Sequence, residues 1–181
     1  MEVAILSDTH IPEQADQIPD QFRNRITKAD HVIHAGDIAS KETLAEVRRL
    51  SDDLTAVYGN ADPVDIDLPP VASLTAEGVV FVVSHGMINF VERAVSSSEG
   101  VVFNRDDWLD AIATTARARA SPEEQVVGIG GHSHEVEDET HDGIRVLNPG
   151  SATGLGPADG RETMMTATVS GDEVSVSVHE L

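Results

Sequence analysis

The sequence predicts an α/β fold in which a parallel sheet is followed along the chain by a second, mostly antiparallel sheet. Strands and helices alternate through residue 58, and strand-like segments dominate the remainder. Hydrophobic residues make up 40% of the chain but aromatic residues only 3%, which indicates an aliphatic core. A chain of 181 residues is expected to form one domain, covering residues 1–181.

The first part of the chain is expected to form three strands with a helix in each interval. Apolar strands are expected at residues 2–7, 31–35 and 54–58. Ile18, Phe22 and Ile26 recur at helical spacing and indicate the first helix, and Ser40 can cap the second. Because parallel strands bind ligands at their carboxyl ends, polar residues just beyond these strands are the candidates for a site.

The second part of the chain begins with a hairpin and ends in several strands. The hairpin is expected at residues 72–76 and 79–83, and a helix at 104–120 carries Asp106 and Asp107 at its positive end. Strands are expected at residues 143–147, 163–169 and 173–178, and we assign them to the second sheet. Residues 87–103 match no element, so a flap over a site and an ordinary surface excursion both stay open.

The charge of the chain is strongly negative. Asp and Glu number 32 against 12 Lys and Arg, for a formal net charge of -20. This charge disfavours nonspecific binding to nucleic acid and to anionic membranes. Lys28 and Lys41 are the only lysines, and together with the acid excess this favours a surface adapted to concentrated salt over a merely acidic mesophilic protein.

The chain contains no cysteine, so disulfides and thiolate metal sites are excluded and any metal must be bound by nitrogen and oxygen. The N-terminus has no basic leader segment, and the longest uniformly apolar stretch, residues 79–83, is too short to cross a bilayer. We therefore expect a cytoplasmic protein in a reducing compartment.

Short polar clusters stand at the ends of the predicted strands. They are Ser7-Asp8-Thr9-His10, Gly36-Asp37, Gly59-Asn60, Ser84-His85 and Gly131-His132-Ser133-His134. In two of these clusters, residues that can bind a metal stand two positions apart: Asp8 with His10, and His132 with His134. This spacing puts both side chains on one side of an extended segment, as the ligands of neighbouring cations require. One cluster alone is weak evidence, since a Gly-Asp pair is usually a turn, but the ordered set indicates a metal site.

These clusters correspond to the motifs D-x-H, G-D, G-N, H and G-H-x-H, in that order along the chain. The ordered set resembles the motifs of the calcineurin-like metallophosphoesterases, and the resemblance covers nearly the whole chain. Residues 9–12, the segment 148–151 and the compact size resemble the family's small phosphodiesterase branch, which also contains the small retromer subunit. The resemblance implies a four-layer αββα sandwich of two mixed β-sheets flanked by helices, with a binuclear metal site between the sheets. It implies Asp8, His10 and His134 as ligands of one metal, Asn60, His85 and His132 as ligands of the other, and Asp37 as a bridge between both.

Two ligand sets that share a carboxylate suit phosphoryl transfer to water. In this reaction two cations neutralise the phosphoryl oxygens, and a hydroxide that bridges the cations attacks phosphorus. Nitrogen and oxygen ligands suit two divalent transition metals, with manganese implied by the resemblance and iron, nickel, cobalt or zinc as alternatives. The expected function is hydrolysis of a small phosphodiester. The alternatives are a phosphomonoesterase and a non-catalytic interaction scaffold of the retromer-subunit type, and homo-oligomer formation stays open.

The sequence departs from the wider family in two places. Larger members carry a histidine after the Gly-Asn motif, thought to protonate the leaving group, whereas Ala61 and then Asp62 follow here. Met87 stands where many relatives have another histidine. Other histidines have simpler interpretations: His34 is expected to be a strand residue satisfied by the backbone rather than a support for a ligand, and His141 to lie on the surface.

Overall fold

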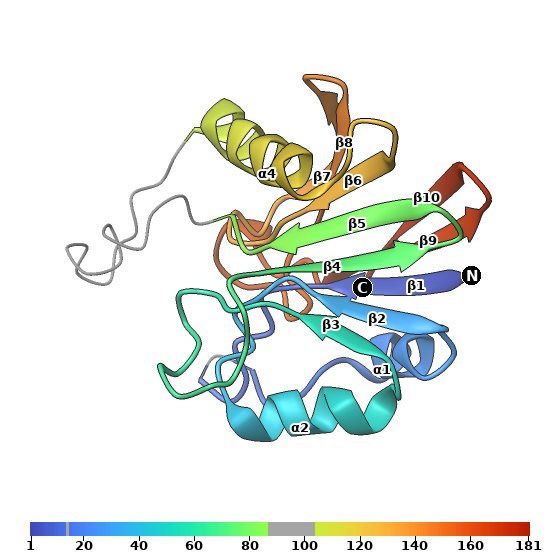
Figure 1. The fold of residues 1–181 in the computed structure, drawn as a ribbon. Helices are drawn as coiled ribbons and strands as arrows, with labels where there is room; N and C mark the ends of the chain where they lie inside the picture. The colour runs from blue at the N-terminus through green and yellow to red at the C-terminus, as the bar shows by residue number, and fades with distance from the viewer. Residues whose placement is uncertain (14, 87–103) are drawn as a thin grey trace.

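The computed structural model describes residues 1–13, 15–86 and 104–181, so the open question at residues 87–103, including Met87, lies outside the described residues. The described chain forms four layers (Figure 1): helices α1 (Asp20–Ile26) and α2 (Lys41–Leu50), two sheets of five strands each, and helix α4 (Arg105–Arg119). This arrangement confirms the predicted α/β class and the αββα layering. No helix of the described residues is long and apolar enough to span a membrane.

Each sheet is mixed. The first sheet has the order β10-β9-β1-β2-β3, with β1 (Glu2–Leu6), β2 (His31–His34), β3 (Leu54–Ala56), β9 (Thr163–Ser170) and β10 (Glu173–Glu180). The second has the order β4-β5-β6-β8-β7, with β4 (Val71–Ala76), β5 (Val79–Ser84), β6 (Gln125–Ile129), β7 (Val136–His141) and β8 (Ile144–Pro149). A short 3-10 helix, η1 (Gly156–Ala158), connects β8 to β9.

Our assignment of the last strands to the second sheet is wrong. β9 and β10 belong to the first sheet, where β9 pairs antiparallel with β1 and places Ala167 opposite Val3. The second sheet is also not mostly antiparallel, because β5 with β6 and β6 with β8 are parallel pairs. Alternating side chains identify a strand, but they carry no information about its partner strand.

Strand β7 was not predicted from the sequence. Its residues include Glu137, Asp138 and Glu139, so it lacks the apolar alternation of a half-buried strand. It forms because it pairs residue by residue with β8 across a tight turn, up to the contact of His141 with Ile144. Hairpin pairing with β8 therefore outweighs the weak strand preference of the β7 residues.

The two sheets enclose an aliphatic core, as predicted. Ile5 and Ile33 of the first sheet meet Phe81 and Ile129 of the second, all with no exposed surface. Alternate residues of β1, such as Leu6, face the helices instead. Both faces of the central strands are thus buried, which fixes their position and aims their carboxyl ends at one edge of the sandwich.

The helices are positioned by caps and by their apolar faces. Ser40 Oγ accepts a hydrogen bond from Thr43 N–H at the start of α2, and the Asn104 side chain accepts one from Asp107 N–H at the start of α4. Phe22 of α1 packs against the first sheet, and Trp108 of α4 packs against the second. In Figure 1 the arrowheads of β2, β3 and β5 point to the same side, where the loops gather.

Candidate metal centre

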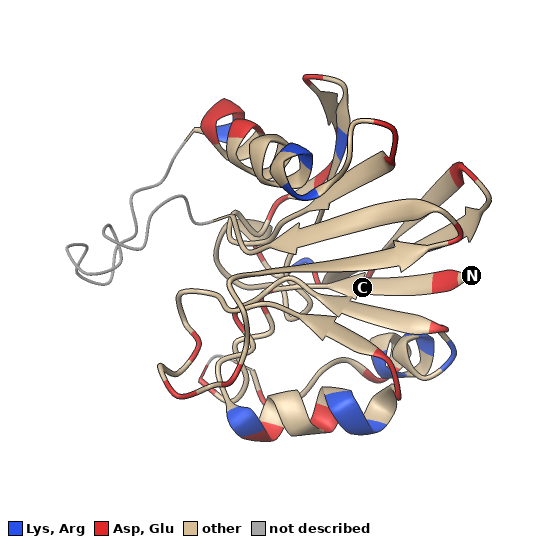
Figure 2. Ribbon diagram, viewed as in Figure 1, with Lys and Arg blue, Asp and Glu red and all other residues tan. Residues whose placement is uncertain are grey.

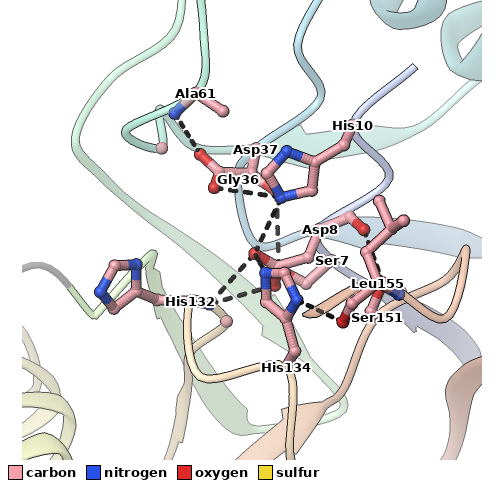
Figure 3. A network of polar contacts seen from close by, with 12 residues as sticks. Ser7, Asp8, His10, Gly36, Asp37, Ala61, His132, His134, Ser151 and Leu155 are labelled. Carbon is pink, nitrogen blue, oxygen red and sulfur yellow. Dashed lines mark hydrogen bonds and ion pairs between the residues drawn. The ribbon is translucent and has the colours of Figure 1, made fainter. Parts of the chain in front are cut away.

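All the residues predicted as metal ligands lie in one network of contacts at the carboxyl ends of β1, β2, β3, β5 and β6. Figure 3 shows Asp8, His10, Asp37, His132 and His134 of this network. Ion-pair distances to Nε2 are 3.2 Å for His134 with Asp8, 3.4 Å for His10 with Asp37 and 3.3 Å for His85 with Asp37. Asn60 Oδ1 lies 2.9 Å from His132 Nδ1 and 3.1 Å from His85 Nε2.

The donor atoms form two overlapping groups. Asp8, His10 and His134 make one, and Asp8, Asp37 and His85 make the other, with the atoms of each group within 4.8 Å of one another. The first group matches the first predicted ligand set. Asp8 belongs to both groups, and Asp37 belongs to the second group, although its Oδ2 also lies 3.4 Å from His10 Nε2 of the first group.

Hydrogen bonds to backbone carbonyls fix two of the imidazole rings. His85 Nδ1 lies 2.7 Å from Ala35 O, and His134 Nδ1 lies 2.7 Å from Leu155 O. A carbonyl oxygen only accepts hydrogen bonds, so each Nδ1 carries a proton and each Nε2 faces the carboxylates, where it can bind a metal once it is deprotonated. This is the orientation in which neutral histidine binds a metal.

His10 provides the test of whether a cation fits. The residue is only 6% exposed, yet neither of its ring nitrogens has a hydrogen-bond partner. A buried polar atom without a partner costs about 1–3 kcal/mol, so such atoms are rare unless something binds there. The unpartnered nitrogen and a donor set of imidazole and carboxylate groups without sulfur fit a divalent transition metal.

The electrostatics of the buried acids and histidines also indicate that a cation fits the centre. Burial alone would raise the pKa of Asp8, but His10, His134 and His85 outweigh it and hold that pKa well below its usual range. Burial would lower the pKa of His85, but the Asp37 and Asp8 carboxylates raise it to about 10. In the chain without cations, a proton on His85 therefore balances part of the charge of the two buried carboxylates.

The backbone at the centre is strained. Positive φ angles occur at Asp8 (53°), His10 (46°), Asp37 (56°), His132 (70°) and His134 (59°). Residues other than glycine rarely adopt this left-handed conformation, and it is retained where the surrounding structure enforces it, most often at functional sites. The strain thus falls on five of the seven predicted ligands.

Two glycines beside the ligands are required by close approach. A Cβ atom on Gly59 would lie 2.2 Å from Asp37 Oδ1, and one on Gly131 would lie 2.0 Å from Ser7 Oγ and 2.7 Å from Asp8 Oδ2. At these two positions the absence of a side chain leaves room for the carboxylates and the Ser7 hydroxyl.

Comparison with known proteins agrees with this geometry. The family model of the calcineurin-like phosphoesterase superfamily domain matches residues 1–172. The chain belongs to this superfamily. A probable metallophosphoesterase from Methanocaldococcus jannaschii is 30% identical over 155 residues, which cover 84% of this chain and 69% of that protein.

Solved structures share the superfamily fold. A Thermotoga maritima protein studied by solution NMR is 27% identical with a TM-score of 0.66, and the match covers 99% of each chain. Vps29 of Entamoeba histolytica, crystallised with Zn²⁺, is 23% identical with a TM-score of 0.72, covering 100% of this chain and 98% of that one. The second likeness concerns the fold alone.

Asp62, which follows Ala61 in the sequence, supports the loops that carry the candidate ligands. Its side chain is buried and accepts four backbone N–H groups. The donors are Asp37 (3.1 Å), Ile38 (2.8 Å), Ala39 (2.8 Å) and Gly59 (2.7 Å). Both oxygens are occupied, so Asp62 joins the loop of Asp37 to the loop of Asn60 and has no position from which to donate a proton to a substrate.

His34 supports the loops on the other side. Its Nδ1 accepts a hydrogen bond from Gly36 N–H (3.3 Å), and its Nε2 lies 3.2 Å from Thr9 Oγ1. The backbone contact agrees with our interpretation, while the Thr9 contact shows that His34 also steadies the segment between Asp8 and His10. Burial lowers the pKa of His34 to about 4, which keeps the ring neutral.

The turn after β8 supports the same segment. Ser151 Oγ donates to Asp8 O (2.9 Å), and Asn148 Nδ2 donates to Gly131 O (3.1 Å). The carbonyl that orients His134 belongs to Leu155, a few residues beyond the segment 148–151. The segment 148–151 therefore supports the loops of the centre, whereas the atom that orients His134 lies beyond it.

The other histidines lie away from the centre. His31 contacts Thr55 at 2.8 Å and His179 contacts Thr166 at 2.9 Å. His141 pairs with Asp110 on the surface of the molecule at 2.6 Å. None of the three joins the two overlapping ligand groups.

Proposed function

We propose that the chain is a metal-dependent phosphodiesterase that hydrolyses a small phosphodiester with two divalent cations. The observation that carries the proposal is the pair of candidate ligand groups. Both groups contain Asp8, and the second also contains Asp37. The superfamily membership supports a hydrolase, and the Zn²⁺ bound by the Entamoeba protein supports a cation in this fold. Manganese remains our proposal for the metal.

Specific residues would hold the cations. Asp8, His10 and His134 would bind one, and Asn60, His85 and His132 would bind the other, with Asp37 between them. Bound divalent cations neutralise charge on phosphoryl oxygens and supply an ionised water as nucleophile. Ala35 O and Leu155 O hold their two histidines with Nε2 directed inward, so the ligand geometry is prepared before any cation enters.

The proposed reaction lacks a side-chain acid for the leaving group. Ala61 offers only a backbone N–H, which donates to Asp37 Oδ1 at 2.7 Å. Asp62 has both oxygens engaged by backbone donors. A leaving oxygen must therefore depart largely unassisted by the described chain, which favours substrates with good leaving groups.

The negative charge of the chain is compatible with an anionic substrate. The formal net charge is -20, and the two acids at the centre are buried. Divalent cations bound there reverse the local potential, so a phosphodiester carrying one negative charge is attracted to a site on an acidic protein. The acidic remainder of the surface disfavours long nucleic acid as a substrate.

The test compares metal content and hydrolysis in one preparation. Apoprotein is reconstituted with Mn²⁺, Zn²⁺ or Ni²⁺, metals are counted by elemental analysis, and hydrolysis of bis(4-nitrophenyl) phosphate and 4-nitrophenyl phosphate is followed at low and molar KCl. His10→Gln should lose metal and activity, whereas His31→Gln, a matched change away from the centre, should keep both.

Three results would count against the proposal in different ways. Folded protein that binds fewer than two metals at saturation contradicts the two-cation mechanism. Fully loaded protein without hydrolysis supports the interaction scaffold instead, and faster hydrolysis of the monoester supports a phosphomonoesterase.

A further inference from the structure

Strand β10 presents the longest free sheet edge among the described residues. It stands at the end of the first sheet and pairs with β9 over its whole length of 8 residues without a bulge. From Val174 to Val178 it contains no charged residue and no proline (Figure 2). Natural proteins usually interrupt such an edge with charge, proline or a bulge, because an open edge pairs with other strands.

The other edges are better protected. β3 has 3 residues, and β7 carries three consecutive acids. β4 is uncharged, but with 6 residues it offers a shorter edge than the 8 residues of β10. Among these edges, the edge of β10 is thus the most favourable one for pairing with another strand.

The direction of the free backbone groups follows from the hydrogen bonds. Leu181 N–H donates to Glu162 O (3.0 Å), one step beyond the last residue pair of β9 and β10. Because successive residues of a strand point their N–H and C=O to opposite sides, Val174, Val176 and Val178 direct these groups away from β9. The oxygen of Val174 already accepts from Arg145 Nη1 (2.6 Å), which leaves it one lone pair.

The sequence of this edge reads the same in both directions. Residues 174–178 are Val-Ser-Val-Ser-Val, symmetric about Val176. A two-fold axis at Val176 therefore pairs valine with valine and serine with serine between two antiparallel copies, and it brings Glu173 opposite His179 rather than opposite another acid.

We propose that this chain forms a two-fold symmetric homodimer in which β10 of each copy pairs antiparallel about Val176, joining the two first sheets into one. A second copy is the partner because an arbitrary strand would not reproduce this symmetry. Val174 and Val176 pack on the core between the sheets, and Val178 is 46% exposed, so pairing also extends the apolar face. The dimer is independent of the proposed phosphodiesterase function.

Charge opposes this dimer in dilute buffer. Each copy carries a formal net charge of -20, and the outermost pair brings Asp172 opposite Glu180. Salt screens both repulsions, so the dimer should strengthen as KCl rises from about 0.15 M to the molar range.

Two double variants test the register. Ser175 and Ser177 are exposed and face each other across the proposed axis. S175K/S177K places lysines opposite lysines and should weaken the dimer, whereas S175E/S177K places glutamate opposite lysine and should preserve it. The lysine pair lowers the net negative charge by two, so a response to net charge alone would have the opposite sign.

Sedimentation equilibrium over a range of protein concentrations measures the dimer dissociation constant at each salt concentration, and circular dichroism checks that each variant is folded. We expect a dissociation constant about tenfold higher for S175K/S177K than for S175E/S177K. Amide hydrogens of Val176 and Val178 should exchange more slowly at dimer-forming concentrations. A monomer under all conditions overturns the proposal, and so does a dimer that responds equally to both variants.

Discussion

Replacing Asp62 by asparagine tests whether the candidate centre depends on a residue that binds no metal. The two shapes are nearly identical, but an amide presents an oxygen on one side and an NH₂ group on the other. In the native chain, Oδ1 accepts from Ile38 and Ala39, and Oδ2 accepts from Asp37 and Gly59. Either orientation of the amide therefore turns NH₂ toward two backbone donors.

The size of the effect follows from those two donors. Each buried N–H left without an acceptor costs about 1–3 kcal/mol, so Asp62→Asn should destabilise the fold by about 2–6 kcal/mol. For a domain of this size, each kcal/mol shifts the Tm by about 2–4 °C, so a fall of at least about 4 °C is expected. Because one donor is the N–H of Asp37, metal affinity should fall as well.

Thermal unfolding and metal titration measure the two consequences. Asp65→Asn is the matched control, since it removes the same charge from the same loop, but its carboxylate is exposed and contacts only Lys41 in the described structure (2.5 Å). That variant should melt close to the parent. An Asp62→Asn protein that melts within about 2 °C of the parent would refute the assigned role of the four hydrogen bonds.

The remaining predictions concern the centre and the surface. Asp37→Ala should lower binding of both cations together, and elemental analysis showing loss of only one would exclude a shared carboxylate. Rates for aryl phosphodiesters should fall steeply as the leaving phenol becomes more basic, and Ala61→His should flatten that dependence if the new imidazole reaches the leaving oxygen; a shallow slope in the parent, with chemistry rate-limiting, would disprove the missing acid. The Tm should rise from dilute buffer to molar KCl, and a constant Tm would contradict adaptation to salt. Chelation of metals should lower the Tm, and no change on chelation would mean that cations add nothing to stability.

Much of the first sheet could be predicted because its signals are local. Apolar runs at β1 and β2 are buried on both faces, so composition alone indicates strands there, and Ser40 caps its helix as expected. The partner of β9 could not be predicted in this way. Pairing with β1 joins segments at opposite ends of the chain, and no local pattern reports such a contact.

The same distinction between local signals and long-range contacts applies to the candidate centre. The clustering of the candidate ligands could be predicted because imidazole and carboxylate groups stand at strand ends in a recognisable order. Asp62 could not be recognised as a support, because its function depends on four backbone groups that carry no side-chain signal. The role of Asp8 between both candidate positions likewise depends on distances to side chains from other loops.

The cost of the centre indicates that a ligand binds there. His10 is buried, neither of its ring nitrogens forms a hydrogen bond, and its backbone has a φ angle of 46°. A docking surface needs exposed side chains and gains nothing from these features, each of which costs on the order of 1–3 kcal/mol. A ligand present at a hundred times its dissociation constant contributes about 2.7 kcal/mol to stability, which is enough to offset one of them. A cation bound at His10 is therefore the simplest reason for the arrangement to persist.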